Sequence, residues 1–130
     1  MKMLLFSLFI SIGFLVNSQV KKRDQGYYKG VISAYTINTS QNLVKVDSCQ
    51  LLIQVDKNSI LIKIDDQEYL GTYRVNKREK RNYVLKAKTK YSDIEEEIIL
   101  FGKTKIMNRK GLFPQPDTQL IKLKKKEVLW

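Results

Sequence analysis

The sequence predicts a small all-β protein: a single antiparallel barrel or sandwich of about seven or eight strands that follows an N-terminal signal peptide. Beyond residue 26, apolar residues recur mostly with a period of two, which is typical of strands with one buried face. Short polar turns separate these apolar runs. The 130 residues are 43% apolar and include only 2 prolines and 6 glycines, a composition typical of a globular domain.

The N-terminus reads as an export signal. Met1-Lys2-Met3 provides a positive start, and the run from Leu4 to Val16 is apolar apart from two serines and a glycine. Val16 and Ser18 fit the small-residue positions of a cleavage site before Gln19. We therefore expect residues 1–18 to be a signal peptide and 19–130 to be one β domain that is secreted, periplasmic or at the cell surface. The alternative is an uncleaved anchor.

The first predicted strand runs from about Tyr28 to Ile37 and ends at a polar turn over 38–41. In the next run, Val44 and Val46 are even-numbered, whereas Cys49, Leu51, Ile53 and Val55 are odd-numbered. This change of parity predicts a bulge or bend at Asp47-Ser48. Cys49, the only cysteine, is expected to be a buried core residue on the same face as Leu51.

Three further strands are separated by polar turns at 56–59, 65–67 and 76–81. Their expected core faces consist of Ile60, Ile62 and Ile64, then Tyr69, Gly71, Tyr73 and Val75, then Tyr83, Leu85 and Ala87.

The segment 91–110 has two interpretations. Ser92-Asp93-Ile94-Glu95 fits a helix capping box, but 98–101 is a compact β-prone run, and strand-like segments lie on both sides of it. We therefore favour two strands. Residues 111–117 hold both prolines and predict an irregular connection, and a last strand is expected from Gln119 to Lys125.

This strand count and topology resemble those of small lipocalin-like barrels. The resemblance implies a ligand in the barrel mouth. Lipocalins usually have Gly-x-Trp at the entry to the first strand, whereas this chain has Gly26-Tyr27-Tyr28 and its sole tryptophan at Trp130. No family is assigned on this basis.

The composition also limits the chemistry. Zero histidine excludes Ser-His-Asp and Cys-His pairs, and one cysteine excludes a disulfide framework within the chain. Asp65, Asp66 and Glu68 lack the order of a calcium loop, and Glu95, Glu96 and Glu97 are expected at the surface. We therefore expect no catalytic residue, no metal and no cofactor.

Two groups of residues are candidate binding sites. Tyr69, Tyr73 and Tyr83 are hypothesised to form an aromatic wall beside Gly71. The net charge is +11, and basic clusters are typical of proteins that attract polyanions. The candidate polyanion-binding residues are Lys77, Arg78, Lys80, Arg81, Lys122, Lys124, Lys125 and Lys126.

The sequence favours a non-catalytic protein that binds an apolar or amphipathic small molecule or a cell-envelope component. The alternative is a cell-surface module whose basic face engages anionic polymers or a protein partner. An enzyme is a third possibility, limited to carboxylate, lysine or tyrosine chemistry. The aromatic residues mostly have core parity, so no specific nucleic-acid site is expected.

Overall fold

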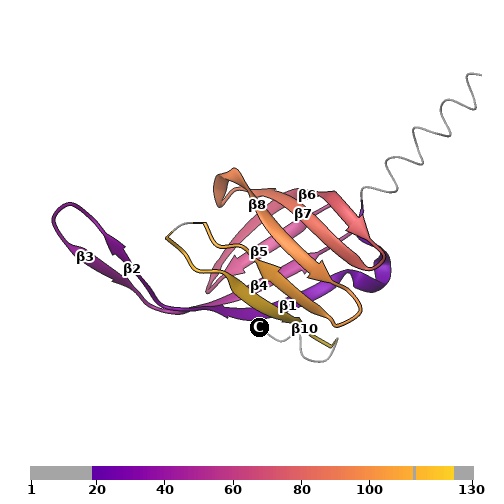
Figure 1. Cartoon of the computed structure of the whole chain (residues 1–130), viewed down its shortest axis with the longest axis horizontal. Helices are drawn as coiled ribbons and strands as arrows, with labels where there is room; N and C mark the ends of the chain where they lie inside the picture. Colours follow the sequence, from indigo (N-terminus) through magenta and orange to yellow (C-terminus); the bar gives the residue numbers. More distant parts are fainter. Residues whose placement is uncertain (1–18, 113, 125–130) are drawn as a thin grey trace, which may run out of the picture.

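A computed structural model of the chain describes residues 19–112 and 114–124. The signal peptide expected at 1–18 and two of the candidate residues, Lys125 and Lys126, lie outside the described residues. The protein is a closed antiparallel barrel of 8 strands, so the barrel alternative is confirmed over the sandwich (Figure 1). The barrel strands are β1 (Gly26–Ile32), β4 (Cys49–Val55), β5 (Ile60–Ile64), β6 (Gln67–Glu79), β7 (Asn82–Thr89), β8 (Ser92–Phe101), β9 (Ile106–Arg109) and β10 (Thr118–Lys122).

The barrel closes because β1 pairs with β4 on one side and with β10 on the other. From β4 to β10 the strands form an up-and-down meander, so successive connections alternate between the two ends. One end, called the η1 end here, carries the 3₁₀ helix η1 (Lys22–Asp24) and the connections β4–β5, β6–β7 and β8–β9. The opposite end, called the loop end, carries the connections β5–β6, β7–β8 and β9–β10.

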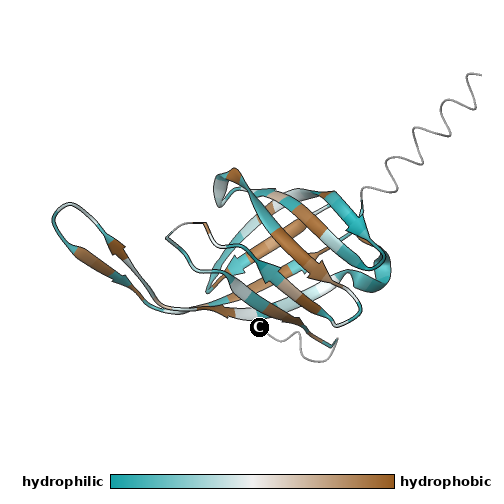
Figure 2. Ribbon diagram, viewed as in Figure 1, coloured by the Kyte–Doolittle hydropathy of each residue, from teal (hydrophilic) through white to brown (hydrophobic). Residues whose placement is uncertain are grey.

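Alternating side chains from the barrel strands fill the interior. Figure 2, in which the ribbon is coloured by hydropathy, shows both brown and teal segments in the barrel. The predicted core residues Ile62 and Leu85 are fully buried, which confirms the parity assigned to their strands. The other fully buried aliphatic and aromatic side chains are Tyr28, Ile32, Leu51, Ile53, Val55, Ile60, Tyr83, Ala87, Ile98, Leu100, Met107 and Leu120.

The ambiguous segment is a strand, because 92–101 forms β8. Its backbone pairs with β7 on one side, where Leu85 lies opposite Ile98, and with β9 on the other, where Met107 lies opposite Leu100. A helix would satisfy its own hydrogen bonds and leave both neighbouring strands without a partner. The prediction of two strands is therefore confirmed.

The turn predicted at 76–81 is shorter than expected. β6 continues to Glu79, and Lys80-Arg81 alone turn the chain, with Lys80 at a φ of 55°. A shift of register between Val75 and Lys77 accommodates the extra length of β6. Polar residues extend this strand pair because their side chains are exposed while their backbones remain paired.

A two-stranded arm, β2 (Tyr35–Asn38) and β3 (Leu43–Val46), projects from the barrel between β1 and β4 (Figure 1). β1 to β4 form one long hairpin, and both of its sides are interrupted at the same level, at 33–34 and at 47–48. The pairing register is the same on either side of this interruption. The strand is thus interrupted at Asp47-Ser48, where a bulge or bend was predicted, but without the extra residue of a bulge. Cys49 is half-buried and packs against the core beside this break.

Candidate functional site

A short N-terminal segment closes the η1 end of the barrel. Val20 and Asp24 are 2% and 1% exposed, so both are packed into the barrel. The Asp24 carboxylate accepts hydrogen bonds from Tyr83 Oη at 2.7 Å and Arg81 Nη2 at 2.6 Å. Tyr28 Oη donates to the backbone oxygen of Asp24 at 2.7 Å. These bonds fix η1 across the end of the barrel.

The Asp24 carboxylate is held in its ionised form. Burial by itself raises the pKa of Asp24, but the hydrogen bonds from Arg81 and Tyr83 and the charge of Arg81 outweigh burial, so the net pKa lies below its usual value. Burial raises the pKa of Tyr83, and the hydrogen bond to Asp24 raises it further. Arg81 is thus the cation that forms an ion pair with this buried carboxylate, at 2.6 Å.

Basic residues gather at the η1 end because alternate connections of the meander meet there. Among the described residues, the carboxylates of this end are the buried Asp24 and the exposed Asp56 and Glu79. The cations of the same end are Lys21, Lys22, Arg23, Lys57, Lys77, Arg78, Lys80, Arg81, Lys103, Lys105, Lys122 and Lys124. The carboxylates Asp65, Asp66, Asp93 and Asp117 lie at the loop end. The loop end also carries the cations Lys90 and Lys110, so its charges are mixed, whereas cations clearly outnumber carboxylates at the η1 end.

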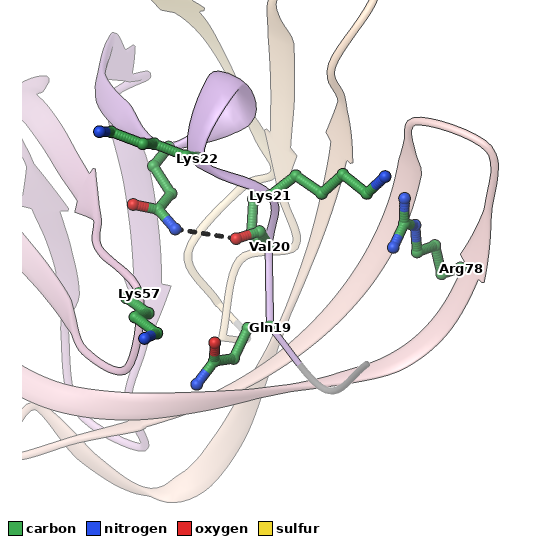
Figure 3. Close-up of a pocket in the computed structure, with 7 residues that line it drawn as sticks. Gln19, Val20, Lys21, Lys22, Lys57 and Arg78 are labelled. Carbon is green, nitrogen blue, oxygen red and sulfur yellow. Dashed lines mark hydrogen bonds between the residues drawn. The ribbon is translucent and has the colours of Figure 1, made fainter. Parts of the chain in front are cut away.

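Two hollows flank η1. The first, called the Lys57 hollow, has a volume of about 490 Å³ and is shown in Figure 3. Its lining residues are Gln19, Val20, Lys21, Lys22, Gln25, Lys57 and Arg78. Gln25 Nε2 donates to the backbone oxygen of Val20 at 2.8 Å, and the Arg78 guanidinium lies 5.2 Å from the ring centre of Tyr83. No carboxylate lines this hollow.

The second, called the Tyr27 hollow, has a volume of about 780 Å³ and lies between the start of β1 and the end of β10. Its lining residues are Arg23, Gln25, Gly26, Tyr27, Lys105, Lys122, Leu123 and Lys124. Four cations and no carboxylate line it, so it is electropositive like the Lys57 hollow. It differs in offering a tyrosine ring and a leucine side chain beside the cations.

The structure brings two of the three candidate tyrosines, Tyr73 and Tyr83, to the η1 end and places Tyr69 apart from them. Tyr83 bonds Asp24 at the η1 end, and Tyr73 Oη donates to the backbone oxygen of Asp56 at 2.6 Å. Tyr69 lies towards the loop end, where its ring packs edge-on against the ring of Tyr91, with 4.9 Å between the two ring centres. None of them lines either hollow. A ligand-binding role for these tyrosines stays a prediction.

The candidate basic residues that the structure describes come together at the η1 end. The hairpin residues 77–81 lie beside the Lys57 hollow, while Lys122 and Lys124 line the Tyr27 hollow. Lys57 and Lys105 were not among the predicted residues. The connections of an antiparallel meander alternate between its two ends. This rule predicts that 56–59, 80–81 and 102–105 lie at the same end and so identifies Lys57 and Lys105.

A second buried ion pair lies inside the barrel towards the loop end. Arg109 and Glu96 are 0% and 1% exposed, and Arg109 Nε donates to Glu96 Oε1 at 2.6 Å. Arg109 Nη1 also donates to Gln115 Oε1 at 2.6 Å, and Gln115 Nε2 donates to Tyr91 Oη at 3.2 Å. The irregular connection 111–117 is thereby tied to the interior.

The position of Glu96 corrects the expectation that Glu95, Glu96 and Glu97 all lie at the surface. Glu95 and Glu97 do point outwards, where they pair with Arg74 at 3.3 Å and Lys86 at 3.1 Å. Alternation along β8 turns the middle residue inwards with Ile98.

Comparison of the chain with protein-family models, curated proteins and solved structures finds no match. Within residues 19–112 and 114–124, no three His, Cys, Asp or Glu side chains are grouped so as to hold a metal ion. In the same part of the chain, no helix has the length and apolar character needed to cross a membrane. The candidate site is therefore defined by its own geometry: a barrel end with two cationic hollows.

Proposed function

We propose that the protein is an exported, non-catalytic binding protein that holds an anionic component of the cell envelope against the η1 end of its barrel. The observation that carries this proposal is the excess of cations at the η1 end, where they surround two hollows that no carboxylate lines. Two further features support a surface site. Side chains from all the barrel strands fill the interior, with β6 contributing the half-buried Tyr73 and Val75, so the interior itself is occupied. The buried carboxylate of Asp24 is already paired with Arg81.

Export is the first part of the proposal, and the packing of Val20 supports the expected cleavage position. A cut before Gln19 retains Val20, which is 2% exposed and whose backbone N–H donates to Tyr73 Oη at 3.3 Å. A cut further along the chain would remove this core residue. N-terminal sequencing of the protein recovered from outside the cytoplasm is expected to begin at Gln19. Recovery of a membrane-bound protein that still begins at Met1 would contradict export.

Anion binding is the second part. Reversing three charges of the basic hairpin, by Lys77→Glu, Arg78→Glu and Lys80→Glu together, is expected to weaken binding to both polyphosphate and a polyuronate by roughly tenfold or more at about 50 mM salt. Arg81 is left in place because it holds Asp24. For the unmodified protein, affinity should fall steeply between about 50 and 200 mM salt, as counterion release predicts. Both affinities are measured by fluorescence anisotropy or calorimetry.

The matched control reverses three exposed lysines away from the η1 end: Lys45→Glu on the arm, and Lys88→Glu and Lys90→Glu near the loop end. It changes the net charge by the same amount, and we expect it to lower affinity by less than about threefold, because screening weakens charge effects beyond roughly 14 Å at about 50 mM salt. Equal losses in the two triple variants would show that net charge alone drives binding. Salt-insensitive binding would also contradict the proposal.

A further inference from the structure

We infer that the Tyr27 hollow binds the phosphate group of an amphipathic phosphorylated molecule, such as a lipid phosphate monoester, with the apolar part of that molecule against Tyr27 and Leu123. This inference rests on the proposed function and names the ligand class of one of its two hollows. The Tyr27 hollow is the larger of the two, and it places a tyrosine ring and a leucine side chain beside four cations.

Backbone hydrogen bonds build the walls of the Tyr27 hollow. The N–H of Leu123 donates to the backbone oxygen of Tyr27 at 2.8 Å, which extends the β1–β10 pairing past the end of the strand. The N–H of Lys122 donates to the backbone oxygen of Lys105 at 3.0 Å. Three separate parts of the chain are thus held together around one space. A ligand that enters it does not have to order the walls first.

The cations of the hollow suit a phosphate better than a neutral ligand. Lys122 Nζ donates to the backbone oxygen of Arg23 at 2.7 Å, so its ammonium is fixed in position. Burial lowers the pKa of Lys122, and the nearby charges of Lys105 and Arg81 lower it further, against the opposing effect of Asp24. An anion beside Lys122 would relieve this repulsion. Lys105 and Lys124 add two ammonium groups that no carboxylate of the lining neutralises.

The size of the hollow indicates a ligand larger than inorganic phosphate. Its volume of about 780 Å³ falls within the range of sites for small organic molecules. Gly26 helps to keep this space open, since its φ is 141° and a Cβ there would lie 3.1 Å from Lys122 Cε. A side chain at this position would be strained and would displace the fixed lysine. The half-buried Tyr27 and Leu123 provide apolar surface for the rest of the ligand.

The test titrates the ¹⁵N-labelled mature protein with dihexanoyl phosphatidic acid, a soluble lipid with a terminal phosphate, and follows backbone amides by NMR. Saturable shifts are expected at Gly26, Tyr27 and Leu123. Dihexanoyl phosphatidylcholine, which carries the same chains under a zwitterionic head group, and inorganic phosphate are each expected to bind at least about tenfold more weakly. These two probes separate the contribution of the chains from that of the phosphate.

Two variants in the same turn provide a matched pair. Lys105→Asn removes a cation that lines the hollow, and asparagine suits the φ of 60° at this position. Lys103→Asn removes an exposed cation two residues away that does not line the hollow. We expect Lys105→Asn to weaken phosphatidic acid binding by about fivefold or more and Lys103→Asn by less than about twofold.

Several results would overturn the inference. Equal losses in the two variants would mean that the charge acts diffusely, and equal affinity for inorganic phosphate and the lipid would mean that the apolar wall contributes nothing. Shifts confined to other residues would place the site elsewhere. Amide shifts at Tyr27 and Leu123 that depend on protein concentration without ligand would make a second copy of the chain the occupant. If the hairpin reversal still weakens polyphosphate binding in any of these cases, the proposed function stands and only the assignment of the hollow falls.

Discussion

Replacing Arg109 by Met is expected to lower the free energy of unfolding by about 3–5 kcal/mol, because the substitution leaves the Glu96 carboxylate buried without its counter-charge. Glu96 is 1% exposed, so water cannot take the place of the guanidinium without a rearrangement of the interior. The substitution also removes the hydrogen bond from Arg109 to Gln115, whose side chain then keeps its bond to Tyr91. Urea denaturation at pH 7 measures the loss.

The double variant Glu96→Met with Arg109→Met is expected to be far more stable than either single variant, within about 1 kcal/mol of the unmodified protein or above it. The ion pair is incompletely satisfied, since three buried polar atoms in this region have no hydrogen-bond partner among the described residues: Glu96 Oε2, Arg109 Nη2 and Thr118 Oγ1. Apolar side chains of similar size remove two of these atoms together. A loss below about 1 kcal/mol in the single Arg109→Met variant would contradict the buried pair.

The sequence predicted the inner faces of the strands that hold Ile62 and Leu85 because alternation is a local property. The strand expected from Tyr28 to Ile37 is instead divided into β1 and β2, and Tyr28 and Ile32 are its buried residues. Ile62 and Leu85 could be assigned to the core from their immediate neighbours, and both are fully buried. The same alternation also predicts which way the Glu96 side chain points. Ile98 and Leu100 are even-numbered and face inwards, so residue 96 of the same strand must face inwards too. Glu96 was expected at the surface because its side chain is charged, although its even number places it on the inner face.

Partners that are distant in the sequence could not be predicted in this way. Asp24 meets Arg81 and Tyr83 only after the barrel closes, and local periodicity does not determine which strands become neighbours at closure. The Tyr27 hollow has the same origin, because it forms where the start of β1 meets the end of β10. The basic residues themselves were visible in the sequence. Their convergence on one end became visible only once the order of the strands was known.

Asp24→Ala is expected to lower the free energy of unfolding at pH 7 by about 2–4 kcal/mol, because the carboxylate accepts hydrogen bonds from both Arg81 and Tyr83. The expected loss is smaller than for Arg109 because the Arg81 side chain is 30% exposed and regains water when its partner is removed. The loss of stability is expected because Asp24 holds η1 across the end of the barrel. Asp56→Asn, at an exposed carboxylate of the same end, is the matched control and should be nearly neutral.

The same carboxylate should give the protein a distinct dependence on pH. The folded-state pKa of Asp24 lies below its ordinary value of 3.8, so the unfolded chain binds a proton more readily than the folded one in this range. The stabilisation from Asp24 is therefore fully present above about pH 5 and is lost as the pH falls through 3.8 towards the folded-state pKa. Asp24→Asn lacks this titration, so the difference in stability between the unmodified protein and this variant should narrow between about pH 5 and pH 2. A difference that stays constant over that range would show that the hydrogen bonds and charge of Arg81 and Tyr83 do not favour the ionised form of Asp24.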